Sequence, residues 1–339
     1  MKASVIVCVY EREREIVRCL ESVVASLEDE TEIVVVDDGS RDGTVEAVRS
    51  LARAASTRAR PIRVVENATN LGVSGARNAG IAAASGDVVL FTDSDCVVDP
   101  DWLRAYLAAF ERRPGMGAAS GLVEEPTPTT LAELAYGGSG AIGRSAAQRR
   151  RLMGCNMAFR KVGLDRHRFD EALDYGCDED EIAWRLERDG FGIGFVESAR
   201  VMHFHRVDTR GFLREGYRLG RGAARYGYKR GHVLGHDLWA LTAAVVCLIA
   251  TPFESQFGVL AAIFLGIQIA AIAFNERWLK GKSLASTLKV LPLDCLYYVY
   301  KAAGTWVTWL RLATGGERAI RASRRQDRLA RSKGYVLSE

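Results

Sequence analysis

Short apolar runs rich in β-branched residues alternate with helix-like segments along the first hundred residues of the chain. The runs cover residues 4–9, 32–36 and 88–92, and apolar residues recur at helical spacing over 16–27 and 44–55. Two strands joined through a helix pair in parallel, and helices then cover both faces of the sheet. The order therefore predicts an α/β fold, a Rossmann-like mixed sheet with helices on both faces.

The middle of the chain is less regular in its pattern. We expect a helix over 100–110, then a loop rich in glycine, proline and threonine through residue 130, and a basic run at 148–151. Two further strand-like pieces, at 154–159 and 192–196, flank an acidic cluster, Asp178-Glu179-Asp180-Glu181, and the helix that follows it. We predict that this first domain covers residues 1–205.

Beyond residue 205 the pattern becomes typical of membrane-associated helices. We predict a basic amphipathic interfacial helix or linker over 206–237, a transmembrane helical hairpin over 238–274, an interfacial or third membrane helix over 284–313, and a basic cytosolic tail over 314–339. Five arginines recur at helical spacing in the first of these segments: Arg210, Arg214, Arg218, Arg221 and Arg225. A solvated charged face and a buried globular hairpin are the competing interpretations.

Charge and cysteine usage bear on location. The net charge is only +4, and the excess of positive charge lies in the last 22 positions. Further basic residues, Arg277, Lys280 and Lys282, stand beside the apolar runs. This pattern favours a membrane surface over nucleic acid and predicts a multi-pass protein of the cell membrane whose first domain faces the cytosol. The seven cysteines form no CxxC pair, which is typical of reduced, cytosol-facing thiols.

Carboxylates follow two of the predicted strands, at the sheet edge where such folds bind ligands. Asp37 and Asp38 precede a glycine turn, and such carboxylates can accept hydrogen bonds from a nucleobase or a ribose. In Asp93-Ser94-Asp95, two carboxylates separated by one residue form a hard oxygen site for Mn²⁺ or Mg²⁺, which substrate phosphates would complete. A solvated loop with a helix cap is the alternative for such a motif.

Residues 70–80 form a glycine-containing loop that opens a helix, with Arg77 in its early turns. Backbone N–H groups and an arginine at such a place can approach the phosphate or ribose of a nucleotide. Neither GxxxxGK[ST] nor GxGxxG is present. Their absence argues against ATPases and dinucleotide-dependent oxidoreductases.

These motifs together resemble glycosyltransferase family 2, whose members have the GT-A nucleotide-sugar-binding fold and transfer sugars with inversion. The resemblance covers residues 3–205 and rests on the segments 5–10, 36–44, 70–80 and 86–87 and on the DxD motif. It implies that Asp95 ligates the metal and that Asp93 faces the nucleotide sugar. The family commonly has proline where Cys8 stands and asparagine where Glu11 stands.

From the residues and the resemblance we predict the following site. The substrate-binding residues are Val9, Tyr10, Glu11, Asp37, Asp38, Arg77, Asp93, Ser94, Asn156 and Asp178, and the metal ligands are Asp95, Asp93 and His203. Within the first group, the resemblance assigns the nucleotide to Val9, Tyr10, Asp38 and Arg77, and the acceptor side to Asn156.

The acidic cluster resembles the family's Glu-Asp pair ahead of an amphipathic helix. Counting back from Arg185 assigns the pair to Asp178 and Glu179, whereas residue identity assigns it to Glu179 and Asp180. The resemblance implies a general base here that removes the proton of the acceptor hydroxyl, so Glu179 and Asp180 are the predicted catalytic residues. Acids that merely favour a helix N-terminus are the alternative explanation.

The sequence thus predicts an enzyme, an inverting, metal-dependent glycosyltransferase that uses Mn²⁺ or Mg²⁺. It would move a single sugar from a UDP-, GDP- or dTDP-sugar to a hydroxyl of a lipid-linked, glycan or other membrane-proximal acceptor. No QxxRW follows the acidic cluster, which disfavours processive polymer synthesis. A polyprenyl-phosphate sugar synthase and a non-catalytic, membrane-anchored nucleotide-sugar-binding protein remain as alternatives.

Overall fold

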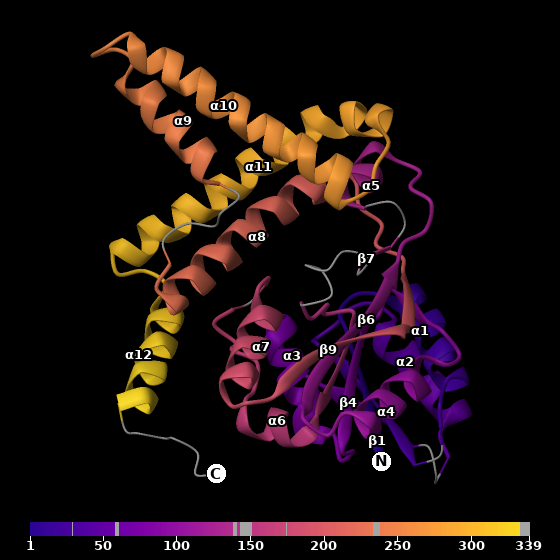
Figure 1. Cartoon of the computed structure of the whole chain (residues 1–339). Coiled ribbons are helices and arrows are strands. Elements are labelled where there is room, and N and C mark those ends of the chain that lie inside the picture. The colour runs from indigo at the N-terminus through magenta and orange to yellow at the C-terminus, as the bar shows by residue number, and fades with distance from the viewer. Residues whose placement is uncertain are drawn as a thin grey trace. The chain divides into compact units, whose positions relative to one another are not determined.

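The structure is a computed structural model that describes residues 1–28, 30–57, 61–137, 141–142, 151–173, 175–232 and 238–332. The chain divides into two compact units (Figure 1). The first contains residues 1–126, 140–174 and 178–205, and the second contains 127–139, 175–177 and 206–339. Residues 148–150 of the predicted basic run and 333–339 of the predicted tail lie outside the described residues.

The first unit is built on a single mixed sheet with the strand order β3-β2-β1-β4-β8-β6-β9-β5, and β7 pairs with β6. β1 is parallel to β2 and β4, whereas β8 runs antiparallel to β4. The strands are β1 Ala3–Val9, β2 Thr31–Asp37, β3 Ile62–Glu66, β4 Val88–Asp93, β5 Cys96–Val98, β6 Met116–Glu124, β7 Ala141–Ile142, β8 Asn156–Arg160 and β9 Gly192–His203.

Helices cover both faces of this sheet, as predicted (Figure 1). They are α1 Glu13–Ala25, α2 Thr44–Ala55, α3 Gly72–Ala83, α4 Trp102–Arg112, α6 Lys161–Arg166 and α7 Asp178–Arg188. Because strand side chains alternate between faces, Val5 of β1 packs in one core with Ile16 and Trp102, whereas Ile6 packs in the other with Ile81. The α/β fold class is confirmed.

The prediction of a loop from the end of the helix at 100–110 to residue 130 is wrong in its first part. Met116–Glu124 form β6, which is almost entirely buried. Small residues with low strand propensity fill this strand, so its sequence does not look like a strand. Close packing explains one of them: a Cβ on Gly121 would lie 2.1 Å from the carbonyl oxygen of Ala199. β3 and β5 were not predicted either, and β9 is much longer than the expected 192–196.

The second unit is helical. It contains α5 Leu131–Tyr136, α8 Thr209–Arg230, α9 Trp239–Ala250, α10 Gln256–Phe274 with its π-helical continuation η2 Asn275–Leu279, α11 Leu284–Ala313 and α12 Arg318–Ser332. α8 and α11 pack with their backbones in close approach. A Cβ on Gly220 would lie 2.0 Å from the Lys301 carbonyl oxygen, and one on Gly304 would lie 2.1 Å from that of Tyr217.

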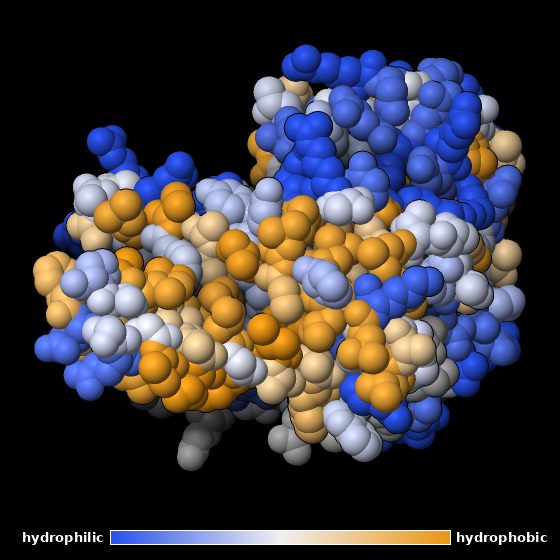
Figure 2. Space-filling view, turned by 90° about the horizontal axis from the view of Figure 1, so that it is seen from above, coloured by the Kyte–Doolittle hydropathy of each residue, from blue (hydrophilic) through white to orange (hydrophobic). Residues whose placement is uncertain are grey.

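One helical stretch among the described residues, 256–279, is long and apolar enough to cross a membrane, with a mean hydropathy of 2.4. The other half of the expected hairpin, α9, has 12 residues and is ~18 Å long, against a hydrocarbon core of ~30 Å. Hydrophobic side chains gather on the face shown in Figure 2. The exposed large hydrophobic residues of the second unit include Phe253, Val259 and Ile263. One span is therefore weakly indicated, while a second span, and one over 284–313, stay predictions.

The arginine stripe lies on α8 but is not one exposed face. Arg210, Arg214 and Arg218 are exposed, whereas Arg225 is buried and forms an ion pair of 2.8 Å with Glu317. The prediction of a continuous basic surface is wrong at its C-terminal end, because Glu317, in the turn between α11 and α12, pairs with Arg225. Similarly, the lysine expected at the membrane surface, Lys282, is buried in an ion pair with Glu276.

Candidate active site

The turn after β2 is fastened by its two aspartates. Oδ2 of Asp37 accepts hydrogen bonds from the backbone N–H groups of Gly39 and Ser40, at 3.1 and 3.0 Å. The Asp38 carboxylate accepts those of Leu71 and Gly72, both at 2.9 Å, and so ties the turn to the start of α3. Within the described part of the chain, the buried Oδ1 of Asp37 has no hydrogen-bond partner. This oxygen is an acceptor suited to a bound ligand.

The end of β1 lies beside this turn. The Val9 carbonyl accepts the Asp38 N–H at 2.8 Å, and Tyr10 is 43% exposed. Glu11 has a φ of +52°, in the left-handed region that side chains other than asparagine, aspartate and glycine rarely adopt. Its N–H is held by the Ser40 hydroxyl at 2.9 Å. The asparagine common in the family would fit this conformation with less strain.

The strain at Glu11 leads to a prediction. Glu11→Asn is expected to raise the free energy of unfolding by ~0.5–1 kcal/mol, because asparagine tolerates the left-handed conformation. Urea unfolding measures the change. The matched control, Glu21→Asn on the exposed face of α1, should instead lower stability by ~0.5 kcal/mol, since asparagine is a poorer helix former. Equal losses in both variants would contradict the assignment of strain.

Arg77 of α3 lies among the acids at the start of α7. Its side chain is 4% exposed, and Nη1 lies 2.5 Å from Oδ2 of Asp178 and 3.0 Å from Oε1 of Glu179. Asp178 is fully enclosed, whereas the Glu179 side chain is 20% exposed. The acidic cluster is therefore more than a set of charges that favour a helix N-terminus, because two of its members share one buried arginine.

The two acids differ in their affinity for protons. Burial, together with the charge of Glu179, raises the pKa of Asp178 well above its ordinary value. Burial would also raise the pKa of Glu179, but the charge of Arg77 and the hydrogen bonds that Glu179 receives together outweigh it and hold that pKa below its ordinary value. A proton on the pair therefore resides on Asp178, and Glu179 is the ionised carboxylate that reaches the surface.

The other two acids have partners of their own. Asp180 forms a bidentate ion pair with the exposed Arg151, with distances of 3.0 and 2.5 Å. Glu181 is completely buried and pairs with Arg185 one turn later. Geometry thus separates the cluster into a buried pair at Arg77, a surface pair at Arg151 and an internal pair within α7.

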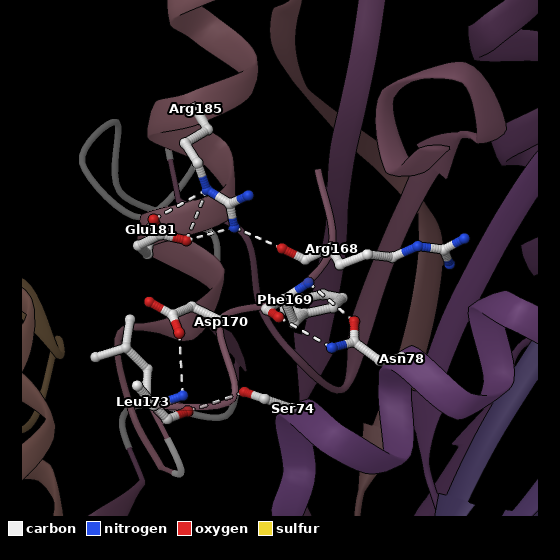
Figure 3. A network of polar contacts seen from close by, with 9 residues as sticks. Ser74, Asn78, Arg168, Phe169, Asp170, Leu173, Glu181 and Arg185 are labelled. Atoms are coloured by element: carbon white, nitrogen blue, oxygen red, sulfur yellow. Dashed lines mark hydrogen bonds and ion pairs between the residues drawn. The ribbon is translucent and has the colours of Figure 1, made fainter. Parts of the chain in front are cut away.

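One loop fixes α3 and α7 relative to each other (Figure 3). The Ser74 hydroxyl donates to the Leu173 carbonyl at 2.9 Å, and the Asn78 side-chain amide donates to the Phe169 carbonyl at 2.9 Å. From the other side, Arg185 donates to the carbonyl of Arg168 at 2.6 Å. Residues 168–173 therefore hold α3, which carries Arg77, and α7, which carries Glu179, in a fixed position relative to each other.

The DxD motif lies between the end of β4 and the start of β5, beside the end of β9. Nε2 of His203 lies 3.3 Å from Oδ1 of Asp95, and Nδ1 of His205 lies 4.0 Å from Oδ2. Asp95, Cys96 and His203 each offer a ligand atom, and these atoms lie within 4.8 Å of one another. A carboxylate and an imidazole suit Mn²⁺, so the donor set fits the predicted metal. Of the predicted ligands, Asp93 is not part of this cluster.

The charges of the Arg77 group reach the DxD motif. Burial raises the pKa of Asp93, while the nearby Arg77 lowers it and the nearby Glu179 adds to the rise. Ser94, between the two aspartates, is buried. The carboxylates of Asp93, at the end of β4, and Glu179, at the start of α7, thus act on one another electrostatically although they are 86 positions apart in the sequence.

Asn156 does not face this site. It is completely buried at the start of β8, where its Oδ1 accepts from the Trp102 indole and the Tyr106 hydroxyl, both at 2.8 Å. Its Nδ2 donates to the carbonyls of Leu122 and Ala199, both at 2.9 Å. The predicted substrate contact is therefore replaced by a structural role, because four internal hydrogen bonds occupy the whole amide.

A prediction tests this role. Asn156→Ala is expected to lower the free energy of unfolding by at least ~3 kcal/mol, since each buried polar group left without a partner costs ~1–3 kcal/mol. Urea unfolding and the KM for the donor are the measurements, and the KM of the folded protein should stay near that of the wild type. If Asn156→Ala keeps the stability of the wild type but has a raised KM for the donor, Asn156 contacts the substrate after all.

Comparison with known proteins agrees with this geometry. Residues 4–159 match the family model "Glycosyl transferase family 2". An uncharacterized glycosyltransferase of Nostoc sp. is 38% identical over 117 residues, which are 34% of this chain and 35% of the relative. The glycosyltransferase AglE of Haloferax volcanii is 33% identical over 127 residues, 37% of this chain and 40% of the relative. The chain thus spans about a third of the length of the curated relatives it matches.

The fold is also found in a solved structure. A mannosyltransferase from Pyrobaculum calidifontis, PcManGT, in complex with GDP-Man and Mn²⁺, aligns with a TM-score of 0.55 and 22% identity. The alignment covers 96% of this chain and 87% of that one. At this identity the similarity establishes the fold, and it does not by itself assign a donor or an acceptor.

Proposed function

We propose that the chain carries a family 2 glycosyltransferase domain and that this domain transfers one sugar from a nucleotide-diphosphate sugar to an acceptor hydroxyl, with inversion. The observation that carries the proposal is the buried pairing of Arg77 with Asp178 and Glu179, whose charges also act on Asp93 of the DxD motif. A carboxylate that can hold a metal and an ionised base near it are what such a transfer requires.

In the proposed reaction, Glu179 is the general base. The acceptor oxygen forms a bond to the anomeric carbon while the bond from that carbon to the diphosphate oxygen breaks, and the nucleotide diphosphate leaves with the electron pair. The hydroxyl proton passes to the Glu179 carboxylate, which Arg77 keeps ionised. Asp178 and Arg77 fix the position of Glu179, because the buried ion pair leaves the arginine little freedom.

Asp95 and His203, with Asp93 on the substrate side, would hold a divalent cation. When bound, such a cation supplies positive charge against the leaving diphosphate. The presence of Mn²⁺ and GDP-Man in the mannosyltransferase of the same fold supports this part of the proposal. The unpaired Oδ1 of Asp37 and the exposed Tyr10 supply contacts for the base or ribose of the nucleotide.

We further propose that the acceptor is lipid-linked and that the second unit attaches the protein to a membrane. The apolar helix 256–279 supports attachment to a membrane, because only 17% of its most apolar 18 residues is buried inside the protein. The exposed arginines at the start of α8 (Arg210, Arg214 and Arg218) support recognition of a phosphate at the membrane surface. A polyprenyl phosphate would itself be an anionic acceptor and would need no strong base.

Donor binding and turnover test the proposal separately. UDP-, GDP- and dTDP-sugars are screened with the full-length protein and Mn²⁺ for a rise in Tm, and release of nucleotide diphosphate is then measured with a lipid extract. We expect one nucleotide class to stabilise the protein and release to depend on the extract. A stabilising donor without release under any acceptor would identify a binding protein instead. No stabilisation by any nucleotide sugar would refute the proposal.

The arginines of α8 carry a prediction for the acceptor. Changing Arg214 and Arg218 to glutamine is expected to raise the KM for a lipid acceptor by ~10–30-fold, because a basic residue at an anionic surface contributes ~1 kcal/mol. Hydrolysis of the donor in water should not change. The control is the change of Arg112 and Arg113, exposed in the first unit, to glutamine. An unchanged KM in the α8 variant would favour the solvated-face interpretation.

A further inference from the structure

The metal cluster contains a donor that a magnesium or manganese site does not need, the thiol of Cys96. We infer that Cys96 makes this site a binding site for thiophilic divalent cations, Zn²⁺ above all, which compete there with Mn²⁺. The inference shares Asp95 and His203 with the proposed donor site. Its test uses metal alone, so it stands or fails independently of transferase activity.

Strand pairing places the thiol. β5 and β9 are antiparallel, and Cys96 is the direct partner of His203 in their register. Side chains of directly opposite residues project from the same face of a sheet, so the sulfur and the imidazole lie side by side. Asp95 precedes Cys96 in the chain, and its carboxylate already contacts the imidazole at 3.3 Å. An oxygen, a sulfur and a nitrogen donor thus lie close together at the start of β5 and the end of β9.

The spacing suits a small tetrahedral ion. Bonds of ~2.0–2.3 Å from zinc to oxygen, nitrogen and sulfur put the ligand atoms about 3.3–3.7 Å apart in a tetrahedron. The three ligand atoms lie within 4.8 Å of one another, so side-chain shifts on the order of 1 Å bring them to these distances. Three protein ligands leave the fourth position to water or to a substrate oxygen, as in other open zinc sites.

Ligand chemistry decides which ion gains from the thiol. A thiolate binds Zn²⁺ and Cd²⁺ far better than Mn²⁺ or Mg²⁺, which prefer oxygen. Coordination releases the thiol proton to solvent, leaving a sulfur–metal bond. The thiol is also shielded from oxidants and alkylating reagents, since Cys96 is completely buried behind its two partners. A second buried thiol, Cys155, is hydrogen-bonded to it.

Cadmium chloride is a direct probe, because Cd²⁺–thiolate bonds absorb in the ultraviolet and Cd²⁺ bonds to oxygen or nitrogen do not. The full-length protein is titrated without nucleotide after its half-buried thiols (Cys8, Cys177, Cys247 and Cys295) have been alkylated. We expect one equivalent of Cd²⁺ to produce the band in the wild type, and Cys96→Ser to lose it. Cys19→Ser is the matched control, since Cys19 is equally buried and its thiol faces the backbone of Asp93 instead.

Competition titrations give the selectivity. Cys96→Ser is expected to weaken Zn²⁺ binding by ~100-fold or more and to change Mn²⁺ binding, followed by electron paramagnetic resonance, less than threefold. His203→Asn should weaken both ions. A band that survives in Cys96→Ser, or a wild type without a band at one equivalent, would overturn the inference. Circular dichroism confirms folding, and Cys96→Ala serves as a second variant if the serine variant is unfolded.

Discussion

Glu179→Gln is expected to lower kcat for sugar transfer by ~10²–10⁴ and to leave the affinity for the nucleotide sugar nearly unchanged. Glutamine keeps the size of the side chain and its hydrogen bond to solvent, but it cannot take up the acceptor proton. Glu179 is the ionised, partly exposed member of the buried pair at Arg77, so the loss should appear in kcat and not in donor binding. Single-turnover kinetics with saturating donor measure it.

The matched control is Asp180→Asn. Its side chain is as accessible as that of Glu179, 21% against 20% exposed, but its carboxylate forms a surface ion pair with Arg151. We expect a change in kcat of less than about threefold, because exposed ion pairs contribute little. If only Asp180→Asn slows transfer, the register taken from residue identity is right. If neither variant does, an acceptor that is already an anion becomes the better interpretation.

The sheet could be predicted where local pattern and tertiary environment agree. Runs such as 4–9 and 32–36 are continuously apolar because helices cover both faces, and the structure buries almost every residue of β1 and β2. β6 shows the opposite case. Its glycines and alanines are there because neighbouring backbone and side chains leave no space, and that requirement comes from β8 and β9, which are distant in the sequence.

In the candidate site too, some contacts could be predicted from the sequence and others could not. Parallel strands end at one edge, so the sequence was sufficient to bring the aspartates after β2 and β4 together. It did not indicate that Arg77 would pair with Asp178, 101 positions away, because that contact depends on the loop 168–173 between α3 and α7. The family resemblance predicted that Asn156 lies at the substrate, whereas the partners that hold its amide in the core come from segments distant in the sequence.

Cys96 and Arg225 failed to stand out for a related reason. A cysteine in an apolar run is usually a core residue, and only the pairing of β5 with β9 brings its sulfur to His203. An arginine on a helical stripe is usually exposed, whereas Arg225 is buried and paired with Glu317, 92 positions later in the chain. In both cases the residue type is readable from the sequence, whereas the partner that decides its role is not.

Asp95→Ala is expected to lower kcat/KM by ~10³-fold or more, because removal of this carboxylate deprives the site of the donor that faces His203 and of the charge needed to hold a divalent cation. Asp101→Ala is the control, since that aspartate, at the N-terminal end of α4, is 68% exposed and forms an ion pair with Arg104. Unfolding by urea and titration with Mn²⁺ separate the effects: stability should persist while Mn²⁺-dependent donor binding disappears. Full activity of the wild type in excess EDTA would contradict the metal site. A lower kcat/KM of Asp95→Ala would then have to come from the altered charge beside Asp93 and Arg77.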